Sequence, residues 1–176
     1  MRQIILDTET TGLDPATGDR LVEIACVETL NTVPSGENFH VYIDPERDMP
    51  EEAFRVHGLS REFLADHKNF AGVVDDFLAF IEDLPLIAHN ADFDVRFLNA
   101  EFAKLGKPSL PAARAIDTIA IAKRRFPGSR YSLDELCKRF NIDLSVRTKH
   151  GARIDAELLA QRSEEHTSEL QSRGLI

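Results

Sequence analysis

The spacing of the apolar residues changes near residue 50, and this change constrains the fold more than any other feature of the chain. Before it, apolar runs at residues 4–6, 21–30 and 39–43 predict three strands, and the short stretches that join them favour an antiparallel meander. Residues 34–36, Pro-Ser-Gly, are typical of a turn between the second and third strands. After the change, apolar residues recur every three or four positions, which is the period of an α-helix.

Helical periods alternate with short apolar runs in the rest of the chain. We expect helices at residues 70–81 and 93–105, before Pro127, after Ser132 and from about Ala152, with short strands at residues 86–88 and 115–116. A strand meander followed by strands interleaved with helices predicts an α/β fold, in which one mixed sheet is covered by helices within a single domain.

Residues 162–176 stand apart from this pattern. The string Arg-Ser-Glu-Glu-His-Thr-Ser-Glu-Leu-Gln-Ser at residues 162–172 matches the translation of a common sequencing-library adapter. The alternative is a native, polar end of the last helix. We interpret the tail as non-native sequence, assign the domain to residues 1–161, and expect the tail to contribute to neither the core nor the activity.

Composition and charge narrow the classes of protein that fit. No apolar run approaches the roughly 20 residues of a membrane-spanning helix, so we expect a cytoplasmic protein without membrane contact. The two cysteines, Cys26 and Cys137, are too few for a disulfide framework. A net charge of −9 argues against a purely electrostatic nucleic-acid binder. It does not exclude an enzyme that holds cations in a carboxylate cluster, because the cations reverse the local charge.

The first informative string is Asp7-Thr8-Glu9-Thr10-Thr11-Gly12, which follows a buried apolar run. Residues two apart on a strand share a face, so Asp7 and Glu9 are expected to project side by side. Two buried, unpaired carboxylates would be costly, and divalent cations remove that cost. A pair of acids on an exposed strand end is an equally good interpretation of this string alone.

Two further strings place acids where a helix begins. In His89-Asn90-Ala91-Asp92-Phe93-Asp94, the carboxylate of Asp92 suits the helix N-terminus, and Asp94 must face elsewhere. The alternative for Asp94 is a second acid favoured by the helix dipole. In the string from His150 to Asp155, the flexible Gly151 would let the histidine and the acid reach one site.

Taken in order, these strings resemble the DEDDh exonucleases, a family named for four acids and a histidine, and more narrowly its epsilon-type proofreading members. Asp7 and Glu9 match the first motif, Asp94 the second, and His150 with Asp155 the third. The interval of five residues between His150 and Asp155 is the histidine-type pattern. Two lesser strings, at residues 52–59 and 126–134, also match the epsilon-type pattern.

The resemblance implies a ribonuclease H-like fold and a two-metal mechanism with Mg²⁺ or Mn²⁺. It implies that Asp7 bridges both cations. It also implies that Glu9 and Asp155 complete the coordination shell of one cation, and that Asp94 acts chiefly through water on the second cation. His150 would take the proton from the attacking water. The product implied is a nucleoside 5′-monophosphate.

The resemblance also implies the substrate and the partner. The substrate would be the 3′ end of single-stranded DNA, and the partner the catalytic subunit of DNA polymerase III, whose binding segment we expect to be missing here. Glu52 and His57 match nucleotide-contacting positions, although Glu52 could merely favour a helix start and His57 a turn. The expected substrate contacts are Asp7, Thr8, Glu9, Thr11, Gly12, Leu13, Glu52, His57, Phe93 and Asp155.

Two alternatives remain open at this point. The first is an RNA-trimming DEDDh exoribonuclease, because residue types alone do not separate DNA from RNA. The second is a non-catalytic module that docks on a polymerase, although such a module would be expected to lose at least one metal ligand.

Overall fold

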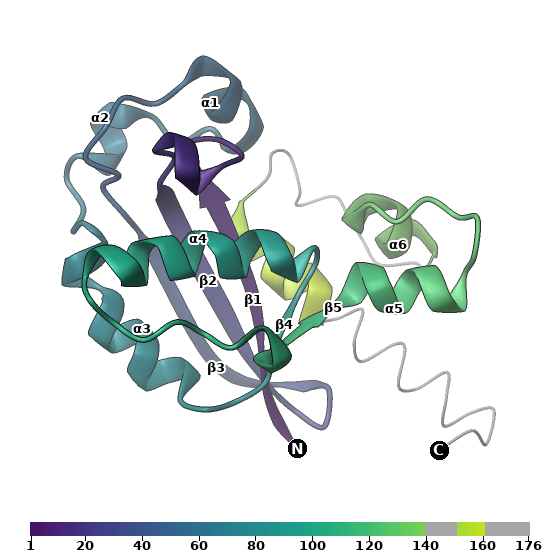
Figure 1. Cartoon of the computed structure of the whole chain (residues 1–176). Coiled ribbons are helices and arrows are strands. Elements are labelled where there is room, and N and C mark those ends of the chain that lie inside the picture. The colour runs from purple at the N-terminus through teal and green to yellow at the C-terminus, as the bar shows by residue number, and fades with distance from the viewer. Residues whose placement is uncertain (140–150, 161–176) are drawn as a thin grey trace.

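The computed structural model describes residues 1–139 and 151–160, which form a five-stranded sheet covered by helices on both faces (Figure 1). The strand order is β3-β2-β1-β4-β5, with β1 (Arg2–Thr10), β2 (Leu21–Leu30) and β3 (Val33–Tyr42) antiparallel. The short strands β4 (Leu86–Ala88) and β5 (Ala115–Asp117) extend the sheet in parallel beyond β1. The predicted mixed α/β sheet is therefore confirmed.

The predicted turn at residues 34–36 is wrong. The chain reverses two residues earlier, at Asn31 and Thr32, whose φ angles of 52° and 74° are those of a left-handed hairpin turn. Pro34 and Gly36 instead lie within β3, which is an edge strand of the sheet. An edge strand tolerates proline because half of its backbone donors have no ladder partner, and the φ of 97° at Gly36 marks a local irregularity.

The helices follow the predicted order, with one change. The helix expected over residues 70–81 begins as the 3₁₀ turn η2 (Phe70–Gly72), and the α-helix α3 starts only at Val74 and ends at Ile81. The helix at residues 93–105 is confirmed as α4 (Ala91–Lys104). Ser132 accepts the backbone N–H of Glu135 at 3.3 Å and so caps the next helix, as predicted.

Further helical elements complete the described part of the chain. Among the described residues, no helix is both long enough and apolar enough to cross a membrane. The remaining elements are η1 (Pro15–Thr17), α1 (Glu51–His57), α2 (Arg61–Leu64), η3 (Ala112–Arg114), α5 (Thr118–Arg125), α6 (Leu133–Arg139) and the helix at residues 152–160.

Two apolar cores lie on opposite faces of the sheet, and β1 contributes to both. Leu6 packs with the phenylalanines of α3 and α4, including Phe97, on one face. Ile5 packs with Ala152 and Ala156 on the other, where the helix at residues 152–160 crosses the sheet (Figure 1). Because successive strand residues alternate between faces, the positions after Ile5 on its own face point toward that helix.

Candidate active site

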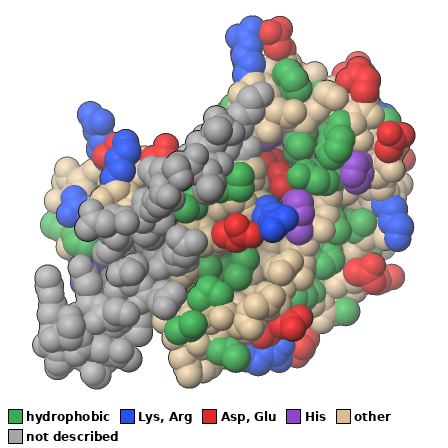
Figure 2. All heavy atoms as spheres, turned by 180° about the vertical axis from the view of Figure 1, so that it is seen from behind, with side chains coloured by type: hydrophobic (Ala, Val, Ile, Leu, Met, Phe, Trp, Pro, Cys, Tyr) green, Lys and Arg blue, Asp and Glu red, His purple; other side chains and the backbone are tan. Residues whose placement is uncertain are grey.

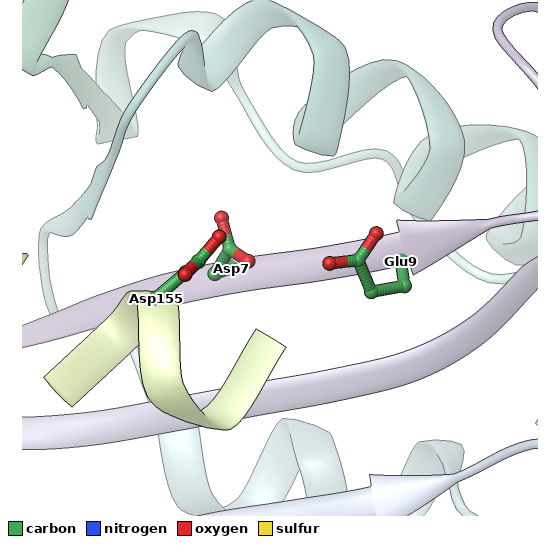
Figure 3. Close-up of side chains that lie close together, drawn as sticks. All are labelled: Asp7, Glu9 and Asp155. Carbon is green, nitrogen blue, oxygen red and sulfur yellow. The ribbon is translucent and has the colours of Figure 1, made fainter. Parts of the chain in front are cut away.

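Three carboxylates meet where the last part of β1 passes the helix at residues 152–160. Asp7 and Glu9 continue the face of Ile5, and Asp155 lies in the first turns of the helix that covers this face (Figure 3). One oxygen from each of the three side chains lies within 4.8 Å of the others. The structure thus brings together acids from two of the three predicted motifs, separated by almost the whole length of the chain.

Burial and mutual repulsion make this cluster electrostatically unfavourable on its own. Burial raises the pKa of Asp7 well above its ordinary value, and the charges of Asp94, Glu9 and Asp155 raise it further. Hard oxygen ligands gathered at one point suit Mg²⁺ or Mn²⁺, whose charge compensates the repulsion. The donor set therefore fits the divalent cations that the sequence predicts.

Asp94 approaches the cluster from the opposite side of β1. It lies in the first turn of α4 and is only 3% exposed. Its Oδ1 accepts a hydrogen bond of 2.7 Å from the hydroxyl of Thr8, which points to the α4 face of the strand. Burial raises the pKa of Asp94 to about 7, although the bond from Thr8 partly offsets the rise. Asp94 lies outside the three-carboxylate cluster, yet its charge acts strongly on Asp7.

The start of α4 points the two acids of the string at residues 89–94 in different directions. Asn90 adopts a left-handed conformation with φ of 75° and turns the chain from β4 into the helix. Asp92 then faces solvent and pairs with Arg96 at 3.5 Å, whereas Asp94 turns inward. Asp117 at the end of β5 accepts the N–H of Asn90 at 3.0 Å and caps α5.

The loop after β1 is rigidly held and presents one apolar side chain to solvent. Thr11 is buried, and its hydroxyl donates to Asp19 at 3.2 Å. A Cβ atom at Gly12 would lie 2.2 Å from a carboxylate oxygen of Asp19, so any larger residue there would displace this carboxylate. Leu13 is 79% exposed. Of the predicted substrate contacts in this loop, Leu13 is therefore the most accessible.

The other predicted substrate residues lie outside the carboxylate cluster. Glu52 is exposed in the first turn of α1, and His57 is buried at the end of the same helix, where its Nδ1 accepts the Leu59 N–H at 3.0 Å. Phe93 is partly buried and stacks on Phe97 at a ring distance of 4.9 Å. His150, the predicted proton acceptor, lies outside the described residues.

Sequence reasoning missed a buried acid beside the cluster. Glu23 is only 3% exposed although it is the third residue of the apolar strand β2, where it lies opposite Glu9 in the ladder. Its position inside an apolar run was the available signal, since a charge there needs a partner. The structure supplies two partners, the side chain of His40 and the backbone of Ala152.

Comparison with known proteins shows which family this chain belongs to. A family model described as an exonuclease matches residues 4–162. The chain belongs to this exonuclease family. Its sequence is 54% identical over 175 residues to the DNA polymerase III subunit epsilon of Rickettsia felis, covering 98% of this chain and 76% of the relative. It is 46% identical over 168 residues to that of Escherichia coli K12, covering 91% of this chain and 69% of the relative.

Solved structures show the same fold at lower identity. The nuclease domain of 3′hExo, a DEDDh family member solved with rAMP, is 17% identical with a TM-score of 0.82, covering 96% of this chain and 92% of that domain. Exonuclease X in complex with 5′ overhanging duplex DNA is 24% identical with a TM-score of 0.70, covering 94% and 92%. The fold is therefore the ribonuclease H-like fold of these exonucleases. The family match and the relatives identify the chain as a 3′–5′ exonuclease.

Proposed function

We propose that this exonuclease removes nucleotides one at a time from the 3′ end of single-stranded DNA, using two divalent cations, Mg²⁺ or Mn²⁺. We propose further that it does so in the cytoplasm as the proofreading subunit beside the catalytic subunit of DNA polymerase III. The names of the relatives from Rickettsia felis and Escherichia coli support the polymerase partner.

The cluster of Asp7, Glu9 and Asp155 is the observation that carries the proposal. Three carboxylates within 4.8 Å of one another, with Asp94 acting on Asp7 from the other side, form a centre of concentrated negative charge. On the face seen in Figure 2, acidic and basic side chains are interspersed, and the described residues visible there form no large basic patch. Cations in the cluster would therefore supply the local attraction for a phosphate.

The roles of the acids follow from the two faces of β1. Asp7, Glu9 and Asp155 would hold one cation, and Asp7 with Asp94 would hold the second. Cations held there supply electrostatic stabilisation of the scissile phosphate and make the attacking water more acidic. Thr8 keeps Asp94 in place through its hydroxyl. His150 would accept the proton of the attacking water, since a histidine with an ordinary pKa is suited to this at neutral pH.

The loop after β1 would hold the terminal nucleotide. Asp19 accepts hydrogen bonds from the hydroxyl of Thr11 and from the backbone N–H of Asp14, so this loop is preorganised before the strand end arrives. The exposed side chain of Leu13 offers an apolar surface for a base or sugar. Glu52, His57 and Phe93 complete the proposed contacts.

The direct test uses a 5′-labelled DNA duplex with either a paired or a mispaired 3′ end, under single-turnover conditions. We expect stepwise shortening with release of nucleoside 5′-monophosphates in Mg²⁺ or Mn²⁺, little turnover in Ca²⁺, and none in excess EDTA. The mispaired end should be digested faster, because separating a good pair costs a few kcal/mol more. Full activity in EDTA would exclude the two-metal mechanism, and equal rates on both ends would contradict proofreading.

Two controls sharpen this experiment. Asp7→Asn should abolish cleavage, whereas Asp92→Asn, which alters an exposed acid on the same helix as Asp94, should leave it unchanged. An RNA strand of the same sequence separates the DNA enzyme from an RNA-trimming exonuclease. Preferential digestion of the RNA would favour the latter, and inactivity on both substrates would favour a non-catalytic docking module.

A further inference from the structure

Glu23 uses both of its carboxylate oxygens inside the protein. Its Oε1 lies 2.7 Å from Nε2 of His40 on the neighbouring strand β3. Its Oε2 accepts the backbone N–H of Ala152 at 3.1 Å, across 129 positions of the sequence. A carboxylate that is 3% exposed is stable only with such partners, so this arrangement fixes the side chain in one position.

The bond to Ala152 is made at the start of the helix that carries Asp155. The Asp155 N–H donates to the carbonyl of Gly151 at 3.0 Å, so the first helical turn spans these residues. The N–H of Ala152 belongs to the first turn, where backbone donors have no partner within the helix. A charged acceptor there also interacts favourably with the helix dipole. Glu23 thus acts as an N-terminal cap that is supplied by a distant strand.

Packing alone constrains the start of this helix only weakly. Ala152 and Ala156 are fully buried against the sheet, and their small side chains let the helix lie close to it. Leu158 and Leu159 are also buried and hold the far end of the helix, whereas the small side chains near its start interlock only weakly with the sheet. The bond from Glu23 fixes the end of the helix nearest to Asp155.

The sheet register connects this anchor to the metal-binding carboxylates. Glu23 lies directly opposite Glu9 in the β1–β2 ladder, and directly opposed residues of an antiparallel pair share a face. One rigid ladder therefore carries Asp7, Glu9 and the acceptor that holds the Asp155 helix. We propose that Glu23 is a positioning residue that sets the distance of Asp155 from Asp7 and Glu9, with His40 orienting its carboxylate. The inference rests on the proposed function of the cluster.

Three substitutions of Glu23 separate its effect on the position of the helix from the effect of its charge. Glu23→Gln removes the charge but keeps an oxygen for Ala152 and an amide group for His40. Glu23→Asp keeps the charge but is one methylene too short to span both partners. Glu23→Ala removes both contacts. We expect Glu23→Ala and Glu23→Asp to lower kcat by about 10–100-fold with little change in KM, and Glu23→Gln to stay near the wild-type kcat.

Two readouts do not depend on cleavage. Hydrogen exchange of peptides covering residues 151–160 should become faster in Glu23→Ala and Glu23→Asp, because the cap is lost. Mn²⁺ affinity, measured by titration calorimetry, should fall by about 10-fold or more in the same variants. Glu28→Ala is the matched control, since Glu28 is a buried acid of the same strand that pairs with Arg2 at 2.6 Å. It should destabilise the protein without changing either readout.

The outcomes decide between the two hypotheses. Unchanged exchange at residues 151–160, or an unchanged kcat in folded Glu23→Ala, would overturn the positioning role and leave the exonuclease proposal standing. A Glu23→Gln variant with a low kcat, but with hydrogen exchange at residues 151–160 as slow as in wild type, would also overturn it. The loss of charge alone would then explain the low kcat. If Glu23→Ala does not fold, Glu23→Asp decides by the same measurements. A wild-type protein without cation-dependent cleavage would refute the proposed function, while exchange would still test the cap.

Discussion

Replacing Asp94 by Asn should stabilise the metal-free protein, and the effect should depend on pH. In the folded protein, burial raises the pKa of Asp94 from 3.8 to about 7. Ionised Asp94 therefore lowers stability when no cation is bound. Asn has the same shape, and its side-chain oxygen can still accept the hydrogen bond from Thr8, so loss of the charge is the main change.

The size and direction of the effect follow from proton linkage. A rise in pKa from 3.8 to about 7 corresponds to about 4 kcal/mol of unfavourable ionisation in the folded state. The folded protein binds this proton more tightly than the unfolded chain, so the cost is absent below pH 4, grows as the pH rises, and is complete above pH 7. The Asn variant should be equal in stability to wild type at pH 4. It should be more stable at pH 8, with a Tm higher by roughly 8–16 °C.

Thermal unfolding in EDTA at several pH values measures this difference directly. Asp92→Asn, on the exposed side of the same helical turn, is the control and should not raise the Tm at pH 8. Adding Mg²⁺ or Mn²⁺ should raise the Tm of wild type and reduce the advantage of the Asn variant, because bound cations compensate the Asp94 charge. Equal melting temperatures of wild type and Asp94→Asn at pH 8 in EDTA would refute the argument.

Further substitutions test the remaining assignments. His150→Ala should slow cleavage by about 10²–10⁴-fold with DNA binding nearly intact, and a wild-type rate would assign His150 a structural role. Asp7→Ala should lose more activity, and calorimetry should show weaker cation binding. Gly12→Ala should raise KM for the strand end while circular dichroism stays native, because the new Cβ displaces the Asp19 carboxylate; an unchanged KM would remove the loop from the substrate site. Deleting residues 162–176 should change neither Tm nor rate, and a loss of several degrees would contradict a non-native tail.

Alternation along β1 was the part of the site that the sequence could predict. Asp7 and Glu9 follow Ile5 at intervals of two, so their shared face needed no structural information. The turn between β2 and β3 was mispredicted because Pro34 and Gly36 also suit an edge strand, and the edge position depends on the order of all five strands. Glu23 was missed for a related reason, since only the packing of a helix 129 positions away explains a charge inside that strand.

The position of Asp94 depends on tertiary packing in the same way. Periodicity predicts that Asp92 and Asp94 face different directions, but only the docking of α4 against β1 brings Asp94 to the hydroxyl of Thr8. A single strand thereby gathers acids from both faces of the sheet, two from its own side chains and one from a helix on each side. Such a gathering is unfavourable without cations, and the raised pKa values of Asp7 and Asp94 express this cost. The same repulsion that weakens the metal-free fold would therefore give the proposed site its affinity for divalent cations.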